Sequence, residues 1–217
     1  MAANALIEGA LRAATPDYGW LSEESADESG RLASRFVWVV DPIDGTRAYL
    51  AGREDWCVSV ALVEGNEPVL GAVFAPVTRE FFWAARGAGA FLNDQPIVAS
   101  GGIELLPPKI AGPKPLVDGL GLPVDAAPIH PRIGSLALRL CRVAEGRLDL
   151  AFVGGRSHDW DLAAAHLIVQ EAGGRMSTLG GDPIVYNRAD VTHDVLVAAG
   201  RERHASVIAH FRNQSVL

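Results

Sequence analysis

The feature that most constrains the fold is the run FVWVV (residues 36–40), a continuous series of aromatic and β-branched residues that ends directly in charge. Such a run is typical of a strand covered on both faces. The residues that follow it read DPIDGT (residues 41–46). Pro42 lacks a backbone donor and favours an extended residue before it, so we expect the strand to stop at Asp41. The sequence therefore predicts a buried strand that brings two carboxylates to one edge of a core.

The DPIDGT segment has two interpretations. Asp, Pro and Gly are common in ordinary surface turns, which is the simpler one. The other is a metal site, because Asp41, Asp44 and the carbonyl of Ile43 offer the oxygen ligands that Mg²⁺ prefers. Gly45 permits a close backbone approach to a ligand, and the amides of Gly45 and Thr46 at a helix start suit a phosphate oxygen. The two interpretations make different predictions about acidic residues elsewhere.

Two other acidic positions lie at the edges of core elements. Glu23 and Glu24 are adjacent in LSEES (residues 21–25), where the simplest interpretation is a solvated pair. Asp161 opens a helix so apolar that it must be largely buried, and Asp is a favoured N-cap residue. A cap can also point its carboxylate into a cleft. Three separated acidic groups together favour a metal site more than any one of them does.

The rest of the chain divides into an N-terminal lobe (1–100), a Gly- and Pro-rich connection (101–131) and a C-terminal lobe (132–217) that we expect to unfold as one cooperative unit. Periodicity predicts a series of helices and strands. We expect helices at residues 2–14, 135–145, 161–172 and 202–212, and strands at 36–40, 56–63, 69–74, 80–84, 148–153 and 195–199. Tight turns between the early strands indicate an antiparallel meander, and the later alternation of helices with strands indicates stacked α and β layers.

Charge and cysteine content limit the partners. The 217 residues carry a formal net charge of −7, so no basic footprint for a nucleic acid polymer or a membrane surface is present. An anionic substrate would then need local help from a cation or from backbone amides. Cys57 and Cys141 each lie in apolar stretches and are expected to be core residues of a reducing, cytoplasmic protein. No apolar run approaches membrane-spanning length.

The motifs together resemble those of the inositol monophosphatase superfamily of metal-dependent phosphomonoesterases. They are SEES at 22–25, DPIDGT at 41–46, and WDLAAA at 160–165 followed by EAGG at 171–174. The segments GAVFAP at 71–76 and GAFLN at 89–93 extend the resemblance over nearly the whole chain from Tyr18. It implies an α/β fold, a layered α-β-α-β-α sandwich with a shortened N-terminal helical region, and a homodimer.

The resemblance also implies a set of site residues. The metal ligands are Glu23, Asp41, the carbonyl of Ile43, Asp44 and Asp161, which would hold two or three Mg²⁺ ions. The resemblance also gives catalytic or substrate-binding roles to residues beyond these metal ligands. Thr46 corresponds to the hydroxyl that orients the attacking water, the amides of Gly45 and Thr46 to the phosphate cradle, and Ser135 in GSLA to a substrate-contacting stretch.

The implied reaction is hydrolysis of a small phosphate ester by a metal-activated water. In such a carboxylate cage, metal ions neutralise the phosphoryl oxygens, activate the water and stabilise the leaving oxygen. Candidate substrates are 3'-phosphoadenosine 5'-phosphate, an inositol monophosphate and histidinol phosphate. A hypothesis of a different class is a truncated, non-catalytic metal-binding or regulatory protein.

The chain departs from the family pattern in four places, one of which is Ser22, where family members usually carry glycine. Only residues 1–20 precede the SEES segment, so an acid that pairs with the threonine is expected to be missing, through truncation or replacement. Loss of a water-activating partner would lower activity by about 10²- to 10⁴-fold. Arg47 follows DGT where inositol-specific members carry threonine, and Gly154 stands where they carry an acid. Arg47 either contacts a second phosphate or faces solvent, and His158 and Asp159 either affect substrate choice or are plain loop residues.

Overall fold

The structure, a computed structural model, describes residues 2–102, 109–122 and 132–214. Its helices are α1 (Ala2–Ala14), the 3₁₀ helix η1 (Ser29–Ala33), α2 (Thr46–Leu50), α3 (Lys114–Asp118), α4 (Leu136–Ala144), α5 (Asp159–Glu171) and α6 (Arg201–Gln214). Its strands are β1 (Gly19–Ser22), β2 (Phe36–Asp44), β3 (Cys57–Glu64), β4 (Glu67–Ala75), β5 (Glu80–Ala85), β6 (Ala90–Leu92), β7 (Gln95–Ile97), β8 (Ile110–Ala111), β9 (Leu150–Val153), β10 (Ser157–His158), β11 (Gly174–Thr178), β12 (Thr192–His193) and β13 (Leu196–Gly200).

The larger sheet contains seven strands in the order β1-β2-β3-β4-β5-β6-β7. Strands β2 to β7 form the antiparallel meander that the turn spacing predicts, while β1 pairs parallel with β2. Val37, Val39 and Val40 of β2 are no more than 1% exposed, but Phe36 and Trp38 are half-buried, so the FVWVV run is not fully covered on both faces as predicted. This sheet carries the DPIDGT segment at the end of β2.

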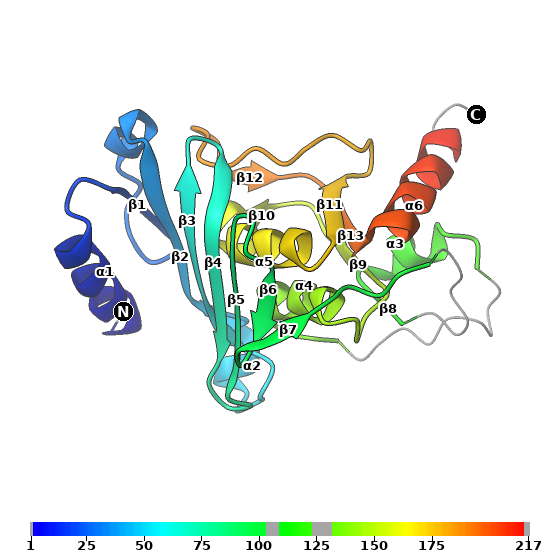
Figure 1. The fold of residues 1–217 in the computed structure, drawn as a ribbon, viewed down its shortest axis with the longest axis horizontal. Coiled ribbons are helices and arrows are strands. Elements are labelled where there is room, and N and C mark those ends of the chain that lie inside the picture. The colour runs from blue at the N-terminus through cyan, green and yellow to red at the C-terminus, as the bar shows by residue number, and fades with distance from the viewer. Residues whose placement is uncertain (1, 103–108, 123–131, 215–217) are drawn as a thin grey trace.

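A second, four-stranded sheet has the order β11-β13-β9-β8, in which β8 pairs parallel with β9. Helices α4 and α5 lie between the two sheets (Figure 1). Their apolar residues join both sheets in one core cluster, with Leu140, Leu162 and Ile168 fully buried. A smaller cluster lies on the outer face of the second sheet, where α3 and α6 cover it.

The layers therefore follow the order α1, large sheet, α4 with α5, small sheet, and α6 with α3 (Figure 1). This confirms the predicted layered α-β-α-β-α sandwich. A close contact sets the spacing of the central layers, because a Cβ atom on Gly71 of β4 would lie 2.5 Å from the carbonyl oxygen of Ala164 in α5. Only glycine allows the helix to approach the strand this closely.

Two sequence-based boundaries were wrong. Strand β2 does not stop at Asp41 but continues to Asp44 through a register shift, and a bulge of this kind accommodates Pro42. Helix α5 begins at Asp159, so Asp161 is its third residue and His158 is the N-cap. The described part of 101–131 contains β8 and α3, so it is more than a connection, while 103–108 and 123–131 lie outside the described residues.

Both cysteines are buried and free, which confirms that they are core residues. Cys57 opens β3 beside the DPIDGT segment, and Cys141 lies in the buried part of α4. Among the described residues, no helix is long and apolar enough to span a bilayer.

Candidate metal centre

Three carboxylates that are far apart in the sequence meet at one point. Asp41 and Asp44 come from the end of β2, and Asp161 comes from the first turn of α5. Each offers a carboxylate oxygen, and these oxygens all lie within 4.8 Å of one another. Asp41 and Asp44 are 1% and 6% exposed, whereas Asp161 is half-buried. A strand and a helix that are far apart in the sequence therefore build one acidic centre.

Hydrogen bonds hold one oxygen of each carboxylate. Asp41 Oδ1 accepts the amide of Ile43 at 2.9 Å, and Asp161 Oδ2 accepts the amide of His158 at 2.7 Å. Asp44 Oδ2 accepts the hydroxyl of Ser135 and the amide of Ala137, each at 2.6 Å. A carboxylate has two oxygens and about four lone-pair sites, so each group can keep these bonds and still bind a cation. The centre is oriented before any ligand arrives.

Burial and mutual repulsion disfavour three ionised groups at this point. Burial, followed by the charges of Asp44 and Glu23, raises the pKa of Asp41 from 3.8 to about 9. Burial, followed by the charges of Asp44 and Glu23 and opposed by the amide of His158, raises the pKa of Asp161 to about 7. Burial also raises the pKa of Asp44, although the bonds from Ser135 and Ala137 oppose the rise. A cation would remove this penalty by compensating the charge.

Glu23 lies near this centre but is exposed. Its amide donates to the carbonyl of Val40 at 3.3 Å, which places it beside the end of β2. Its charge raises the pKa of both Asp41 and Asp161. It is not among the three groups whose oxygens converge, so the structure places it at the edge of the centre. Glu24 is also exposed at this edge.

The residues behind Asp161 form a buried polar network. Asp159 is fully buried, and its carboxylate contacts Nε2 of His193 at 2.6 Å and accepts the amide of Asn187 at 2.7 Å. The side chain of Asn187 accepts Arg31 Nη1 at 2.6 Å. Asp159 is therefore not a plain loop residue, because it ties the start of α5 to the segment before β12. His158 is half-exposed, and its ring stacks on Trp160 with centroids 4.6 Å apart.

The Gly45-Thr46 turn starts α2, as predicted. Gly45 has a φ of 91°, and a Cβ atom there would lie 2.9 Å from the amide nitrogen of Ser135, so glycine is required by the backbone itself. The Thr46 hydroxyl donates to the carbonyl of Ile43 at 3.1 Å. The Thr46 amide lies in the first turn of α2, where amides have no acceptor within the helix. The turn is therefore compatible with the phosphate cradle that the motif implies.

A cavity of about 510 Å³ opens beside this turn. Gly45, Thr46 and Gly134 form its backbone side, and the lining also includes Arg53 and Arg132. Arg53 is held in place, because it pairs with Asp55 and donates to the carbonyl of Arg132 at 3.1 Å.

Arg47 is exposed and lines the same cavity, which agrees with the solvent-facing interpretation and also places it where a ligand would lie. Three arginines, Arg47, Arg53 and Arg132, thus line the cavity that opens at the Gly45-Thr46 turn. Arg53 and Arg132 were missed in the sequence because they belong to separate loops with no motif of their own.

Ser135 is placed differently from the expectation. It is fully buried, and its hydroxyl donates to Asp44 while accepting the amide of Leu138 at 2.9 Å as the N-cap of α4. The thiol of Cys57 lies 3.1 Å from the same hydroxyl. A hydroxyl occupied in this way holds Asp44 instead of reaching into the cavity. Cys57 was interpreted only as a core residue, although it also lines the back of the centre.

The donor set of this centre fits a hard divalent cation. All converging side-chain donors are carboxylate oxygens, and no thiol or imidazole joins them among the described residues. Such oxygens suit Mg²⁺, which is commonly bound through one or two carboxylates together with water and substrate phosphates. The raised pKa values of Asp41 and Asp161 indicate that these groups need a compensating charge to ionise at neutral pH.

Comparison with known proteins agrees with this geometry. The sequence model of the inositol monophosphatase family matches residues 1–112 and 114–215. A protein of Xylella fastidiosa named Nus factor SuhB is 40% identical over 191 residues, which cover 82% of this chain and 67% of that protein. A protein of Mesorhizobium japonicum named inositol-1-monophosphatase is 34% identical over 207 residues, covering 91% of this chain and 74% of that protein.

Solved structures show the same fold. The extragenic suppressor protein suhB of Bartonella henselae superposes with a TM-score of 0.82 at 30% identity, covering 96% of this chain and 85% of that chain. The inositol monophosphatase of Thermotoga maritima superposes with a TM-score of 0.80 at 28% identity, covering 97% of this chain and 80% of that chain.

Proposed function

The chain belongs to the inositol monophosphatase family, and from this membership and the three-carboxylate centre we propose that the protein is a Mg²⁺-dependent phosphomonoesterase of a small phosphorylated metabolite. The observation that carries the proposal is the convergence of Asp41, Asp44 and Asp161, together with Gly45 and Thr46, which follow Asp44 directly in the chain and line a cavity. Bound Mg²⁺ supplies charge neutralisation of the phosphoryl group and a water of lowered pKa.

The residues of the chain have distinct roles in this proposal. Asp41, Asp44 and Asp161 hold the cation, with the Ile43 carbonyl and Glu23 as further ligands at the edge. The amides of Gly45 and Thr46 bind phosphoryl oxygens. The Thr46 hydroxyl faces the same region and orients the attacking water. Because the protein carries a net charge of −7, an anionic ester binds there only with the help of the bound cation and these amides.

The substrate we favour carries a second anionic group. Arg47, Arg53 and Arg132 line the cavity next to the phosphate cradle, and within the part of the chain that the structure describes Arg53 alone among them is paired with a carboxylate. Guanidinium groups bind phosphate in a bidentate manner. This favours 3'-phosphoadenosine 5'-phosphate over an inositol monophosphate, which has one phosphate. Histidinol phosphate is the least favoured, because its amine would face three cations.

The test of the reaction is phosphate release in Mg²⁺ by the wild type and by two variants. We expect Asp41→Asn and Asp161→Asn to lower turnover by at least about 10²-fold, the size of loss seen when charge stabilisation of a transition state is removed. Asp17→Asn is the matched control, because Asp17 is an exposed aspartate outside the site. If Asp41→Asn turns over normally while folded, the assignment of the centre is wrong.

The test of the substrate is a comparison of kcat/KM over a panel of inositol monophosphates, 3'-phosphoadenosine 5'-phosphate and histidinol phosphate. We expect Arg132→Gln to reduce kcat/KM for the bisphosphate by about tenfold, as for one lost charge-assisted hydrogen bond, and to reduce it less for a monophosphate. An equal reduction for both would contradict a second phosphate in the cavity.

The second candidate is a non-catalytic regulatory protein that keeps the metal centre. What favours it is that a relative 40% identical to this chain is named a Nus factor. Both candidates predict that Mg²⁺ raises the melting temperature. Only the phosphatase releases phosphate, so stabilisation without turnover on the whole panel supports the second candidate.

A further inference from the structure

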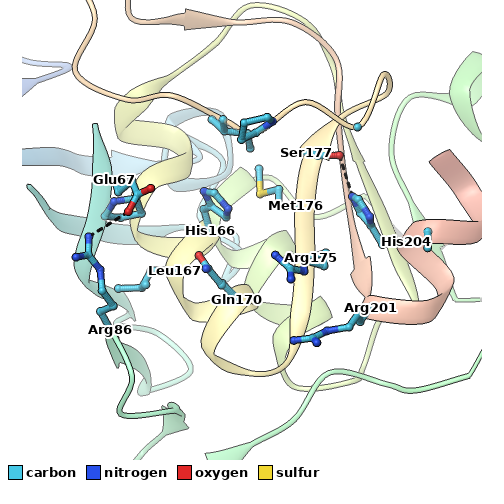
Figure 2. Close-up of a pocket in the computed structure, with 15 residues that line it drawn as sticks. Glu67, Arg86, His166, Leu167, Gln170, Arg175, Met176, Ser177, Arg201 and His204 are labelled. Carbon is cyan, nitrogen blue, oxygen red and sulfur yellow. Dashed lines mark hydrogen bonds and ion pairs between the residues drawn. The ribbon is translucent and has the colours of Figure 1, made fainter. Parts of the chain in front are cut away.

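A second cavity lies at the other end of α5. Its volume is about 600 Å³, and it is formed by residues of β4, α5, β11 and α6 together with the segment that follows β11 (Figure 2). Leu167, Met176 and Ile184 contribute apolar surface to its lining. Its α5 residues His166 and Gln170 follow Asp161 by five and nine residues, about 7 to 13 Å along a helix axis, and none of its lining residues lines the first cavity or belongs to the metal centre. This cavity is therefore separate from the metal centre.

Two arginines at this cavity have unused guanidinium groups. Arg175 extends from β11 and Arg201 from the start of α6, and Figure 2 shows both side chains on the same side of the cavity. Neither makes an ion pair or a side-chain hydrogen bond with any residue that the structure describes. Arg86, by contrast, lies 3.4 Å from both Glu64 and Glu67 and is largely compensated. The uncompensated positive charge of the cavity comes from Arg175 and Arg201.

The two histidines of the cavity add polar groups without charge at neutral pH. Burial, followed by the charge of His193, lowers the pKa of His166 to about 4, and its Nδ1 lies 3.0 Å from the hydroxyl of Tyr186. Burial, followed by the charge of Arg175, also lowers the pKa of His204. The neutral rings together with the apolar surface suit an uncharged ring system.

Ser177 and His204 resemble a nucleophile and its base, with His204 Nε2 2.9 Å from the hydroxyl oxygen (Figure 2). The hydroxyl, however, donates its single hydrogen to the carbonyl of Thr178 at 2.8 Å. Ser177 must then accept the hydrogen bond from His204, which is the reverse of what activates a serine. The pair therefore shapes the wall of a binding site and does not form a catalytic pair.

We propose that this cavity binds a small phosphorylated molecule with an apolar ring, independently of the metal centre. Its phosphate pairs with Arg175 and Arg201, and its ring lies on Leu167, Met176 and Ile184. A phosphate monoester carries a charge of about −1.5 to −2 at pH 7. Two guanidinium groups match this charge better than they match the single negative charge of a carboxylate ligand. The volume falls within the range of about 300–1,000 Å³ typical of small-molecule sites.

The experiment is a calorimetric titration of the full chain with adenosine 5'-monophosphate in excess EDTA. Removing divalent cations removes the positive charge that would neutralise a phosphoryl group at the metal centre, so binding there is weakened. Adenosine and inorganic phosphate are titrated separately. We expect the nucleotide to bind more tightly than either part, and binding to weaken with added salt because the arginines are exposed.

The matched variants remove two positive charges from one cavity at a time. We expect the double variant R175Q/R201Q to weaken nucleotide binding by at least about tenfold, the loss that follows from removing charge-assisted hydrogen bonds. The double variant R47Q/R132Q should leave it unchanged. An unchanged melting curve shows that each variant is folded, and the single variant Arg201→Gln replaces the double variant if that one unfolds.

Three outcomes overturn the proposal. They are no binding in EDTA, equal affinity for adenosine and the nucleotide, or a greater loss in R47Q/R132Q than in R175Q/R201Q. Each of these leaves the proposed Mg²⁺-dependent hydrolysis to be judged separately, because that reaction is tested with Asp41→Asn in the presence of the metal that the titration excludes.

Discussion

The two ends of α5 differ in charge and in construction. At its first turn, Asp161 meets Asp41 and Asp44 in a centre whose carboxylates are buried and held by hydrogen bonds. Toward its other end, Arg175 and Arg201 are exposed and line a cavity. Neither forms an ion pair with another residue that the structure describes. Acids at a helix N-terminus are also favoured by the helix dipole. The acidic end is a preorganised site that needs a cation, whereas the basic end keeps its charge in solvent at little cost.

The largest expected effect is a pH dependence of stability that arises from the carboxylates at the acidic end of α5. Without metal, the folded-state pKa of Asp41 is about 9 and that of Asp161 about 7, both above the unfolded value of 3.8. The folded state therefore holds more protons, and stability that is complete below about pH 4 is lost as the pH rises to about 9. We expect the melting temperature in EDTA to fall steadily between pH 7 and 8.5.

Between pH 7 and 8.5, the change in stability with pH comes from the carboxylates and not from the histidines. His166 and His204 have lowered pKa values, so they make stability rise with pH, and most of this rise is over above their ordinary pKa of about 6.5. Adding Mg²⁺ should raise the melting temperature more at pH 8.5 than at pH 6, because the cation replaces protons. Asp41→Asn should flatten the slope in EDTA. A melting temperature in EDTA that is constant or rises with pH would contradict the description of the acidic end.

The next effect tests what holds the acidic end in place. Asp159→Ala removes a fully buried carboxylate and leaves His193 and the amide of Asn187 without their acceptor. We expect a loss of about 3–5 kcal/mol in the free energy of unfolding, as for breaking a buried pair from one side. Urea denaturation measures it, with Asp17→Ala as the exposed control. A loss below about 1 kcal/mol would show that the network does not support the start of α5.

The smallest effect concerns the middle of α5, which both ends share. Gly71→Ala places a methyl group against the carbonyl of Ala164, and overpacking of this kind costs about 1–3 kcal/mol. Because α5 shifts as a unit, we expect a lower melting temperature together with weaker Mg²⁺ stabilisation and weaker nucleotide binding. Gly30→Ala is the control, since no atom lies within 4 Å of a Cβ there. A change at only one end would mean that the two ends are not coupled through the helix.

Much of the fold could be predicted because local patterns decide it. The FVWVV run, the meander and the apolar helix after Asp161 all appeared as expected, within a few residues. The wrong boundaries lie where tertiary contacts override a local rule. Pro42 did not end β2, because a bulge tolerates it, and two residues before Asp161 joined α5 because Asp159 has buried partners. Short strands such as β10 and β12 have too few residues to carry a pattern.

The residues of the candidate site also fall into those that the sequence identified and those that it did not. Asp41, Asp44 and Asp161 could be named from their motifs, since carboxylates at the edges of core elements have few structural reasons to be there. Ser135 could be named too, but not its position behind Asp44. Arg53 and Arg132 could not be found at all, because unrelated loops bring them to the cavity. Arg175 and Arg201 likewise come from a strand and a helix that carry no shared motif.

The sequence by itself determined which elements form and which chemistry the DPIDGT turn supports, because hydrophobic period, turn residues and ligand type are local properties. Only the tertiary structure decided which charges face one another. It brought Asp161 to Asp44 across 117 positions of sequence, and it placed Arg47, Arg53 and Arg132 in the lining of one cavity. The reason is that electrostatic energy depends on distance and burial in space, which the packing of two sheets around α4 and α5 sets and no local pattern records.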